Sequence, residues 1–430
     1  MSVRWAPAGP AVTTAGDLPV PPAGPPVKLL HVITRLEAGA GGNTLLSAAG
    51  MDRRRYEPWI AGGAGGALWA AARDAGVRTV QIPGFGRDLA PADDLRVLGA
   101  LVRLMRRERF GIVHLHSAKA GALGRIAAVA AAVPVVIYTL HGRDPWWPGP
   151  DRQASQLTDV MGRGLRAFRL TETLLRPVTH RFVAVAPTVA RDAVLAGVAT
   201  PGRMSVAPSA VDMSQIPNAA DRTVRAELGI AGDAPLVGTV GRLDPQKAPL
   251  DFVRMAAALA ITNPGIRFVM VGDGPLRPQA EALAAELRVD VLFTGQRPDA
   301  PRVASAFDVF VVSSLYEGVG RAVTEAMASA RPVVATAVDG VVDLVEPGST
   351  GLLAPPRDPA RLADAVRWLL AHPAEAARMG EQGRERVRGL FTQARMCAAL
   401  DEVYAELLGL EPPAGTGAAG VLARSGRCDD

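Results

Sequence analysis

Residues 308–336 read DVFVVSSLYEGVGRAVTEAMASARPVVAT, and their hydrophobic pattern changes twice within this stretch. The apolar, β-branched runs DVFVVSS at its start and RPVVAT at its end are typical of short buried strands. Between them, the loop EGVG leads into a stretch that we interpret as a helix. A strand, a helix and a second strand in this order predict a parallel β-sheet covered by helices.

The same alternation of short apolar runs and helical stretches extends in both directions along the chain. In the second half, further strands are expected at PLVGTVG (235–241), IRFVMVG (266–272), VLFTG (291–295) and GLLAP (351–355). In the first half, strands are expected at VKLLHVI (27–33), YEPWIAG (56–62), VRTVQI (77–82), IVHLH (112–116), VPVVIYTL (133–140) and RFVAVA (181–186). Helices are expected at 43–51, 66–75, 92–108 and 119–131, and over 359–408 with breaks near 372–373 and 389.

A chain of 430 residues is long for a single core, and the loop SAVDMSQIPN separates the two series of strands. We predict an α/β protein with two doubly wound, Rossmann-like domains and a ligand in the crevice at the carboxyl ends of the strands. The expected parts are a disordered Pro/Ala-rich tail at 1–26, a first domain at 27–210, a second domain at 211–390, a helix at 391–409 that packs back on the first domain, and a disordered tail at 410–430.

The composition is that of a globular protein, with 49% hydrophobic and 21% charged residues. The two cysteines, Cys397 and Cys428, are too few for a disulfide framework, and their spacing matches no metal motif. The N-terminal stretch lacks the apolar core of a signal peptide, and no run of about eighteen apolar residues could span a membrane. We therefore expect a cytoplasmic protein.

The charge is unevenly distributed along the chain. Residues 1–210 contain 25 Lys and Arg against 14 Asp and Glu, whereas the remainder contains 22 against 28. A basic first half favours contact with nucleic acid, an anionic membrane surface or phosphorylated substrates. The alternative is an ordinary solvated surface in a sequence that uses arginine far more often than lysine.

Three glycines follow the first expected strand, in RLEAGAGGN at residues 35–43. Gly39, Gly41 and Gly42 allow a tight turn, and the helix that follows offers free N–H groups to an anion. The spacing differs from the GxGxxG pattern of dinucleotide-binding oxidoreductases, which argues against that class.

Two basic residues follow the carboxyl end of an expected strand in GRLDPQK, residues 241–247. Arg242 and Lys247 suit a diphosphate, because two positive charges on one loop offset its charge and arginine adds forked hydrogen bonds. The alternative is that both are surface charges that cap the next helix.

The EGVG loop combines glycines with two acidic residues. Gly318 and Gly320 leave room for a ligand to approach the backbone, and the N–H groups of Val319 to Arg321, at a helix N-terminus, suit its phosphates. The carboxylates of Glu317 and Glu325 suit sugar hydroxyls, which donate charge-assisted hydrogen bonds to them. The alternative is that Glu325 pairs with Arg321 one helical turn earlier.

The spacing of Glu317 and Glu325 within EGVGRAVTEAMASARPVVAT resembles the Glu-x7-Glu motif of the family 4 retaining glycosyltransferases. The resemblance covers roughly residues 28–409. Its further segments are HVITRLEAGAGGNTLLSAAGM, HLHSAKAGALGRIAA, VIYTLHG, GRLDPQK, VGDGPL and FTGQR.

This resemblance implies a GT-B architecture, with the two domains facing each other across a cleft, and transfer of a sugar from a nucleoside-diphosphate sugar such as a UDP-sugar with retention at the anomeric carbon. Arg242 and Lys247 would hold the donor diphosphate, and Glu317 would contact the transferred sugar. His141, after the expected strand VPVVIYTL, would lie beside the reacting centre. Glu325 would bind the ribose hydroxyls.

The resemblance also implies that Gly41 and Gly42 close over the donor phosphates, and that backbone amides near Gly320 contact sugar or phosphate. Two positions depart from the family pattern. Val319 stands where a larger residue is common, and Asp343 where glutamate is common. Both departures leave the charged groups in place, so they bear on donor choice rather than on activity.

No Asp-x-Asp occurs in the sequence, the spacing by which metal-dependent glycosyltransferases hold a diphosphate through a divalent ion. The negative charge that builds on the leaving group must still be offset, and preorganised cations do so without a metal. We therefore expect neither a metal nor another cofactor.

The acceptor side is expected after the strand IVHLH, at His116, Ser117 and Lys119. Trp146 and Trp147, on a proline-rich loop, suit stacking against a sugar or contact with a membrane interface. Arginines interleave with apolar residues over 160–176, which fits a membrane-bound amphipathic helix or an ordinary core helix with long arginine stems.

We expect a sugar, lipid-linked or small-molecule acceptor in cell-envelope polysaccharide, glycolipid or natural-product glycoside synthesis. Peripheral contact with the inner face of an anionic membrane is part of this expectation, and nucleic acid is not an expected partner. The alternatives are a GT-B sugar-nucleotide epimerase and a non-catalytic sugar- or nucleotide-binding relative. Arg242, Lys247 and both glutamates are present, which argues against the non-catalytic alternative.

Overall fold

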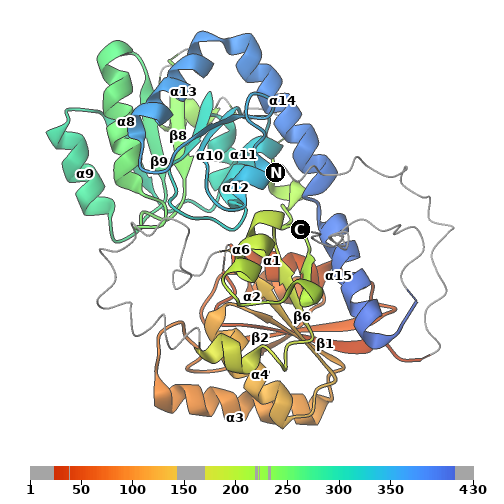
Figure 1. The fold of residues 1–430 in the computed structure, drawn as a ribbon. Helices are drawn as coiled ribbons and strands as arrows, with labels where there is room; N and C mark the ends of the chain where they lie inside the picture. Colours follow the sequence, from red (N-terminus) through yellow and green to blue (C-terminus); the bar gives the residue numbers. More distant parts are fainter. Residues whose placement is uncertain are drawn as a thin grey trace, which may run out of the picture.

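The computed structural model describes residues 24–37, 39–142, 170–217, 221, 223–230 and 234–411. These residues form two α/β lobes, one above the other in Figure 1. The predictions for most of both tails, for Trp146 and Trp147, and for most of the segment 160–176 lie outside the described residues.

The N-terminal lobe contains a seven-stranded sheet in the order β3-β2-β1-β4-β5-β6-β7, with every neighbouring pair parallel. Its strands are β1 (Val27–Ile33), β2 (Tyr56–Gly62), β3 (Arg78–Gln81), β4 (Ile112–His116), β5 (Val135–Leu140), β6 (Arg181–Ala184) and β7 (Met204–Val206). The helices between them, within the described residues, include α1 (Ala40–Ala49), α2 (Trp69–Asp74), α3 (Pro91–Glu108), α4 (Ala118–Ala130) and α6 (Pro187–Leu195). The central strands β4 and β5 are buried along their whole length, because helices cover both faces of a parallel sheet.

The C-terminal lobe contains a six-stranded parallel sheet in the order β10-β9-β8-β11-β12-β13. Its strands are β8 (Leu236–Val240), β9 (Arg267–Val271), β10 (Val291–Gly295), β11 (Val309–Val312), β12 (Val333–Thr336) and β13 (Leu352–Ala354). Its helices are α7 (Thr223–Glu227), α8 (Pro249–Thr262), α9 (Arg277–Glu286), α10 (Ala300–Ser305), α11 (Arg321–Ala328), α12 (Val341–Leu344), α13 (Pro359–Ala371) and α14 (Pro373–Leu390).

The predicted fold class of two doubly wound parallel α/β domains is confirmed, and the stretch 308–336 forms the unit β11-α11-β12. The first helix needs a correction, because it begins at Ala40 rather than at residue 43. Gly41 and Gly42 therefore belong to the first turn of α1, and only Gly39 of the three glycines has a positive φ, of 78°. The three-residue edge strand β7 was not predicted, since so short a run carries no periodic signal.

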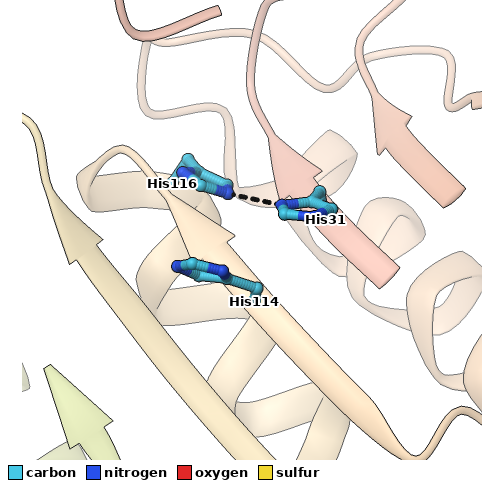
Figure 2. Close-up of side chains that lie close together, drawn as sticks. All are labelled: His31, His114 and His116. Atoms are coloured by element: carbon cyan, nitrogen blue, oxygen red, sulfur yellow. Dashed lines mark hydrogen bonds between the residues drawn. The ribbon is translucent and has the colours of Figure 1, made fainter. Parts of the chain in front are cut away.

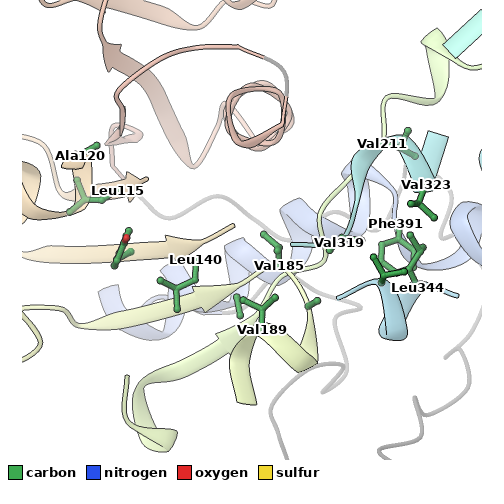
Figure 3. Packing of buried hydrophobic residues seen from close by; sticks show 14 of the residues in the cluster. Leu115, Ala120, Leu140, Val185, Val189, Val211, Val319, Val323, Leu344 and Phe391 are labelled. Atoms are coloured by element: carbon green, nitrogen blue, oxygen red, sulfur yellow. The ribbon is translucent and has the colours of Figure 1, made fainter. Parts of the chain in front are cut away.

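The two lobes share apolar packing. Figure 3 shows Val185 and Val189 of the N-terminal lobe in the same cluster as Val319 and Leu344 of the C-terminal lobe. The cluster also contains Phe391, which lies at the break between α14 and the next helix. This continuous core fixes one lobe against the other.

The last described helix, α15 (Gln393–Leu408), returns from the C-terminal lobe to the N-terminal lobe (Figure 1). Its residues Met396, Leu400 and Tyr404 are buried against Leu29 and Ile112 of the N-terminal sheet. Among the described residues, no helix combines the length and hydrophobicity that crossing a bilayer requires.

A buried ion pair holds α4 to the segment before β6. The guanidinium of Arg125 is completely buried and donates hydrogen bonds of 2.9 and 2.5 Å to the two carboxylate oxygens of Glu172. It also lies 4.8 Å from the centre of the Tyr138 ring. Each of these two buried charges depends on its partner, because water does not reach the site to solvate a charge that is left alone.

We predict that Glu172→Gln lowers the free energy of unfolding by about 3–5 kcal/mol, because it leaves the Arg125 charge buried without a counter-charge. Urea unfolding followed by circular dichroism measures this change. The control is Asp364→Asn, which breaks an exposed pair with Arg367 and should scarcely move the midpoint. Equal shifts for both variants would contradict the structural role of the buried pair.

Candidate active site

The carboxyl ends of β8 and β11 open onto a recess in the C-terminal lobe. The two strands are neighbours in the parallel sheet, so the loops that follow them meet at one edge. Among the predicted site residues, those that line the recess are Arg242, Lys247, Glu317 and Gly320. The fold therefore brings two cations and a carboxylate together from loops about seventy positions apart.

An ion pair between Lys247 and Glu317 forms one wall of the recess. The Glu317 side chain is 6% exposed and the Lys247 side chain 24%, so the amine keeps access to the recess. The Ser314 hydroxyl donates a 2.7 Å hydrogen bond to the same Glu317 carboxylate. The Glu317 backbone N–H donates to the Asp339 carboxylate at 2.8 Å. Glu317 is thus held through both its side chain and its backbone.

Ser314 and Asp339 are site residues that the sequence alone did not predict. Ser314 is one of two polar residues directly after the apolar β11, and that change of pattern was an available signal. Asp339 follows β12, and only the pairing of β11 with β12 brings it to Glu317.

Arg242 lies at the mouth of the recess, with a side chain that is 60% exposed. Its guanidinium lies 2.9 Å from the Asp244 carboxylate and donates a 3.1 Å hydrogen bond to the Gln246 side chain. These neighbours orient the guanidinium and leave most of its donors open to solvent.

The two lobes meet main chain to main chain at the loops after β5 and β11. A Cβ atom on Gly318 would overlap the carbonyl oxygen of His141, and a Cβ on Gly142 would lie 2.9 Å from the Gly318 Cα. Only glycine fits both positions. The contact brings His141 of the N-terminal lobe next to the loop that carries Glu317.

A second contact between the lobes involves Arg321 and the first turn of α1. A Cβ on Gly42 would overlap the Arg321 guanidinium, which also donates a 2.8 Å hydrogen bond to Glu325. Burial raises the pKa of the Glu325 carboxyl, and Asp212 in the linker raises it further, whereas Arg321 opposes the shift. The pairing left open in the sequence analysis is therefore present, and a role of Glu325 at a ribose stays a prediction.

Val319 does not line the recess. It is 4% exposed and packs in the apolar cluster between the lobes (Figure 3). Only the backbone of this residue is therefore available to a ligand.

His141 lies at the end of a hydrogen-bonded chain of imidazoles. Its Nε2 lies 2.8 Å from Nδ1 of His116, which is 1% exposed. Burial lowers the pKa of His141 to about 4, so the ring is neutral at pH 7. His116 is therefore buried behind His141, and its contact with an acceptor stays a prediction.

Ser117 and Lys119, the other described residues expected on the acceptor side, make structural contacts. Ser117 has φ 71° and ψ 151°, a region almost restricted to glycine, and its hydroxyl lies 3.1 Å from that of Thr34. Lys119 is 9% exposed, forms a 2.5 Å ion pair with Asp94 and donates to the backbone carbonyl of Asp88. Its amine therefore holds the first turn of α3 and the loop before it, and a role towards an acceptor stays a prediction.

Three buried histidines lie together in the N-terminal lobe, and Figure 2 shows them as His31 on β1 and His114 and His116 on β4. One nitrogen from each ring lies within 4.8 Å of the others, which is a spacing that a metal ion could use. Both nitrogens of His114 are already engaged, however, with the Tyr404 hydroxyl at 2.6 Å and the Thr139 hydroxyl at 2.5 Å. The group is therefore best described as a hydrogen-bonded cluster.

Comparison with protein families gives two matches that together span most of the chain. Residues 220–386 match the family described as glycosyl transferases group 1, and residues 41–215 match glycosyltransferase family 4. The chain is similar to sucrose-phosphate synthase from Thermosynechococcus elongatus, with a TM-score of 0.75, 22% identity and coverage of 89% of this chain and 99% of the other. It is also similar to Anabaena HepE in complex with UDP and glucose, with a TM-score of 0.73, 20% identity and coverage of 88% and 100%.

Two curated relatives are more similar in sequence. The chain is 31% identical to an Escherichia coli UDP-Gal:alpha-D-GlcNAc-diphosphoundecaprenol alpha-1,3-galactosyltransferase, over 65% of this chain and 71% of the relative. It is 30% identical to alpha-maltose-1-phosphate synthase of Mycolicibacterium smegmatis, over 82% of this chain and 98% of the relative. The chain therefore belongs to glycosyltransferase family 4, and it is a glycosyltransferase with the GT-B fold.

Proposed function

We propose that the recess holds the diphosphate of a UDP-sugar, and that the enzyme transfers the sugar to its acceptor with retention of configuration and without a metal ion. Arg242 and Lys247 offset the charge of the diphosphate and of the leaving nucleoside diphosphate. Glu317 accepts hydrogen bonds from the transferred sugar, and the neutral ring of His141 faces that sugar from the other lobe. Gly41 and Gly42 close over the phosphates.

The observation that carries this proposal is the Lys247–Glu317 pair, which lines the recess beside the exposed Arg242. A dianionic diphosphate needs nearby cations, and sugar hydroxyls need acceptors. The recess supplies both within one small volume. The names of two similar proteins agree with a UDP-sugar, since one is a UDP-Gal-dependent transferase and the other was solved with UDP and glucose.

We further propose that the acceptor is lipid-linked and that the N-terminal lobe contacts an anionic membrane. The name of the Escherichia coli relative includes a diphosphoundecaprenol acceptor. The excess of basic residues in the first half of the chain favours an anionic surface. Leu170 and Leu174, which are 60% and 66% exposed, offer apolar side chains to it.

Removal of either charge of the pair should slow the transfer reaction. We expect Lys247→Met and Glu317→Gln each to lower kcat about a hundredfold, the scale on which a lost transition-state interaction acts. Radiolabelled sugar transfer measures kcat, and circular dichroism checks the fold. The control is Arg254→Met on α8, an exposed cation paired with Asp251, which should keep normal activity. Wild-type turnover in either site variant would refute the assignment.

Treatment with EDTA should leave the initial rate of transfer unchanged, because the two cations of the recess take the place of a divalent ion. The rate is measured before and after chelation, with and without added Mg²⁺ or Mn²⁺. A rate that falls on chelation and returns with the metal would overturn the metal-free mechanism.

UDP should raise the melting temperature of the protein. At a concentration of about one hundred times its Kd, a ligand stabilises the folded state by about 2.7 kcal/mol. We expect Arg242→Ala to reduce this shift and Arg254→Ala to leave it unchanged, because only Arg242 lines the recess. An equal shift in both variants would place the diphosphate elsewhere.

A further inference from the structure

The imidazoles of His31, His116 and His141 form a continuous hydrogen-bonded chain from the core of the N-terminal lobe to the loop after β5, which contacts the loop that carries Glu317. His31 Nδ1 lies 2.9 Å from His116 Nε2, the contact drawn in Figure 2. His116 Nδ1 in turn lies 2.8 Å from His141 Nε2. His31 and His116 are fully buried, so protein atoms rather than water determine where their protons lie.

The chain is uncharged at neutral pH. Burial lowers the pKa of His31 to about 3 and that of His141 to about 4, and it lowers the pKa of His116 well below its usual value. A neutral imidazole has one N–H and one lone pair, so each ring donates through one nitrogen and accepts through the other. The three tautomers are therefore coupled, and fixing one ring fixes all three.

Two arrangements of protons satisfy both hydrogen bonds, and they differ at the buried end. His31 Nε2 is buried and has no hydrogen-bond partner among the described residues. If the protons point towards His31, this nitrogen carries an N–H with no acceptor. If they point towards the cleft, it carries only a lone pair. Buried donors without a partner are rarer in proteins than under-used acceptors, which favours protons that point towards the cleft.

We propose that His31 and His116 are positioning residues that hold His141 in the tautomer with its proton on Nδ1, so that the ring presents a hydrogen-bond donor to the cleft. This inference rests on the proposed function for its role in catalysis. A neutral donor next to the EGVG loop stabilises an oxygen of the UDP-sugar without adding a charge. In the opposite tautomer, Nδ1 of His141 would be an acceptor and would lose that interaction.

His114 provides a matched control, because it lies on the same strand as His116 and is also fully buried. Its hydrogen bonds go to Tyr404 and Thr139 instead of the chain. Replacement of His31 or His114 by leucine removes a buried imidazole in both cases. Only the replacement of His31 removes a member of the chain.

The test is a long-range ¹H–¹⁵N correlation spectrum of the full chain labelled at histidine, with the His141 signals assigned from a His141→Gln variant. In the wild-type protein we expect His141 to carry its proton on Nδ1. His31→Leu should give a mixture of tautomers at His141, and His114→Leu should not. His31→Asn should restore the single tautomer, because its amide nitrogen takes the place of the Nδ1 donor.

The change in kcat should follow the change in the tautomer of His141. We expect His31→Leu to lower kcat roughly twofold to tenfold, in proportion to the fraction of His141 that leaves the Nδ1–H tautomer. The proposal is wrong if wild-type His141 carries its proton on Nε2, or if His31→Leu leaves its tautomer unchanged. If His31→Leu does not fold, the wild-type and His31→Asn spectra still decide it. The spectra need no substrate. A protein that shows the expected tautomer of His141 but transfers no sugar would therefore contradict the proposed function without contradicting the tautomer assignment.

Discussion

The close approach of two backbone segments, at Gly142 and Gly318, is the constraint on which the arrangement of the two lobes around the site depends. Each lobe presents the carboxyl end of its parallel sheet, and the loops touch because neither glycine has a side chain. The contact lets His141 approach the loop of Glu317 from the other lobe. Packing around Val319 maintains it, and the Thr188 backbone N–H donates to the Asp343 carboxylate across the boundary at 2.7 Å.

The charges in the cleft are arranged in pairs. Glu317 is held by Lys247 and Glu325 by Arg321, so neither acid is buried without a cation. Arg242 is much more exposed than either member of the Lys247–Glu317 pair, and it is oriented at the mouth by neutral and acidic neighbours. The histidine chain on the opposite side adds polar groups without charge. Among these groups, the positive charges that face an anionic ligand are therefore those of the C-terminal lobe.

Much of the fold could be predicted because buried parallel strands appear in the sequence as short runs of apolar residues. The six strands expected in the first half and the six expected in the second half were all found, and the short edge strand β7 was missed. The predicted start of α1 is three residues too late, because glycines are more common in loops than in helices. In the structure two of them lie in the helix, where their small size admits Leu36 backbone atoms or the Arg321 side chain.

The sequence by itself determined which residues stand at the ends of strands, since strand and helix periods can be read locally. It therefore brought Arg242, Lys247 and Glu317 into one hypothesis. Only the tertiary structure decided which partners these residues have. Asp339 reaches Glu317 through the pairing of β11 with β12, and His31 reaches His116 through the register of β1 against β4. Such contacts depend on which strands become neighbours in the sheet, and that order joins residues far apart in the chain.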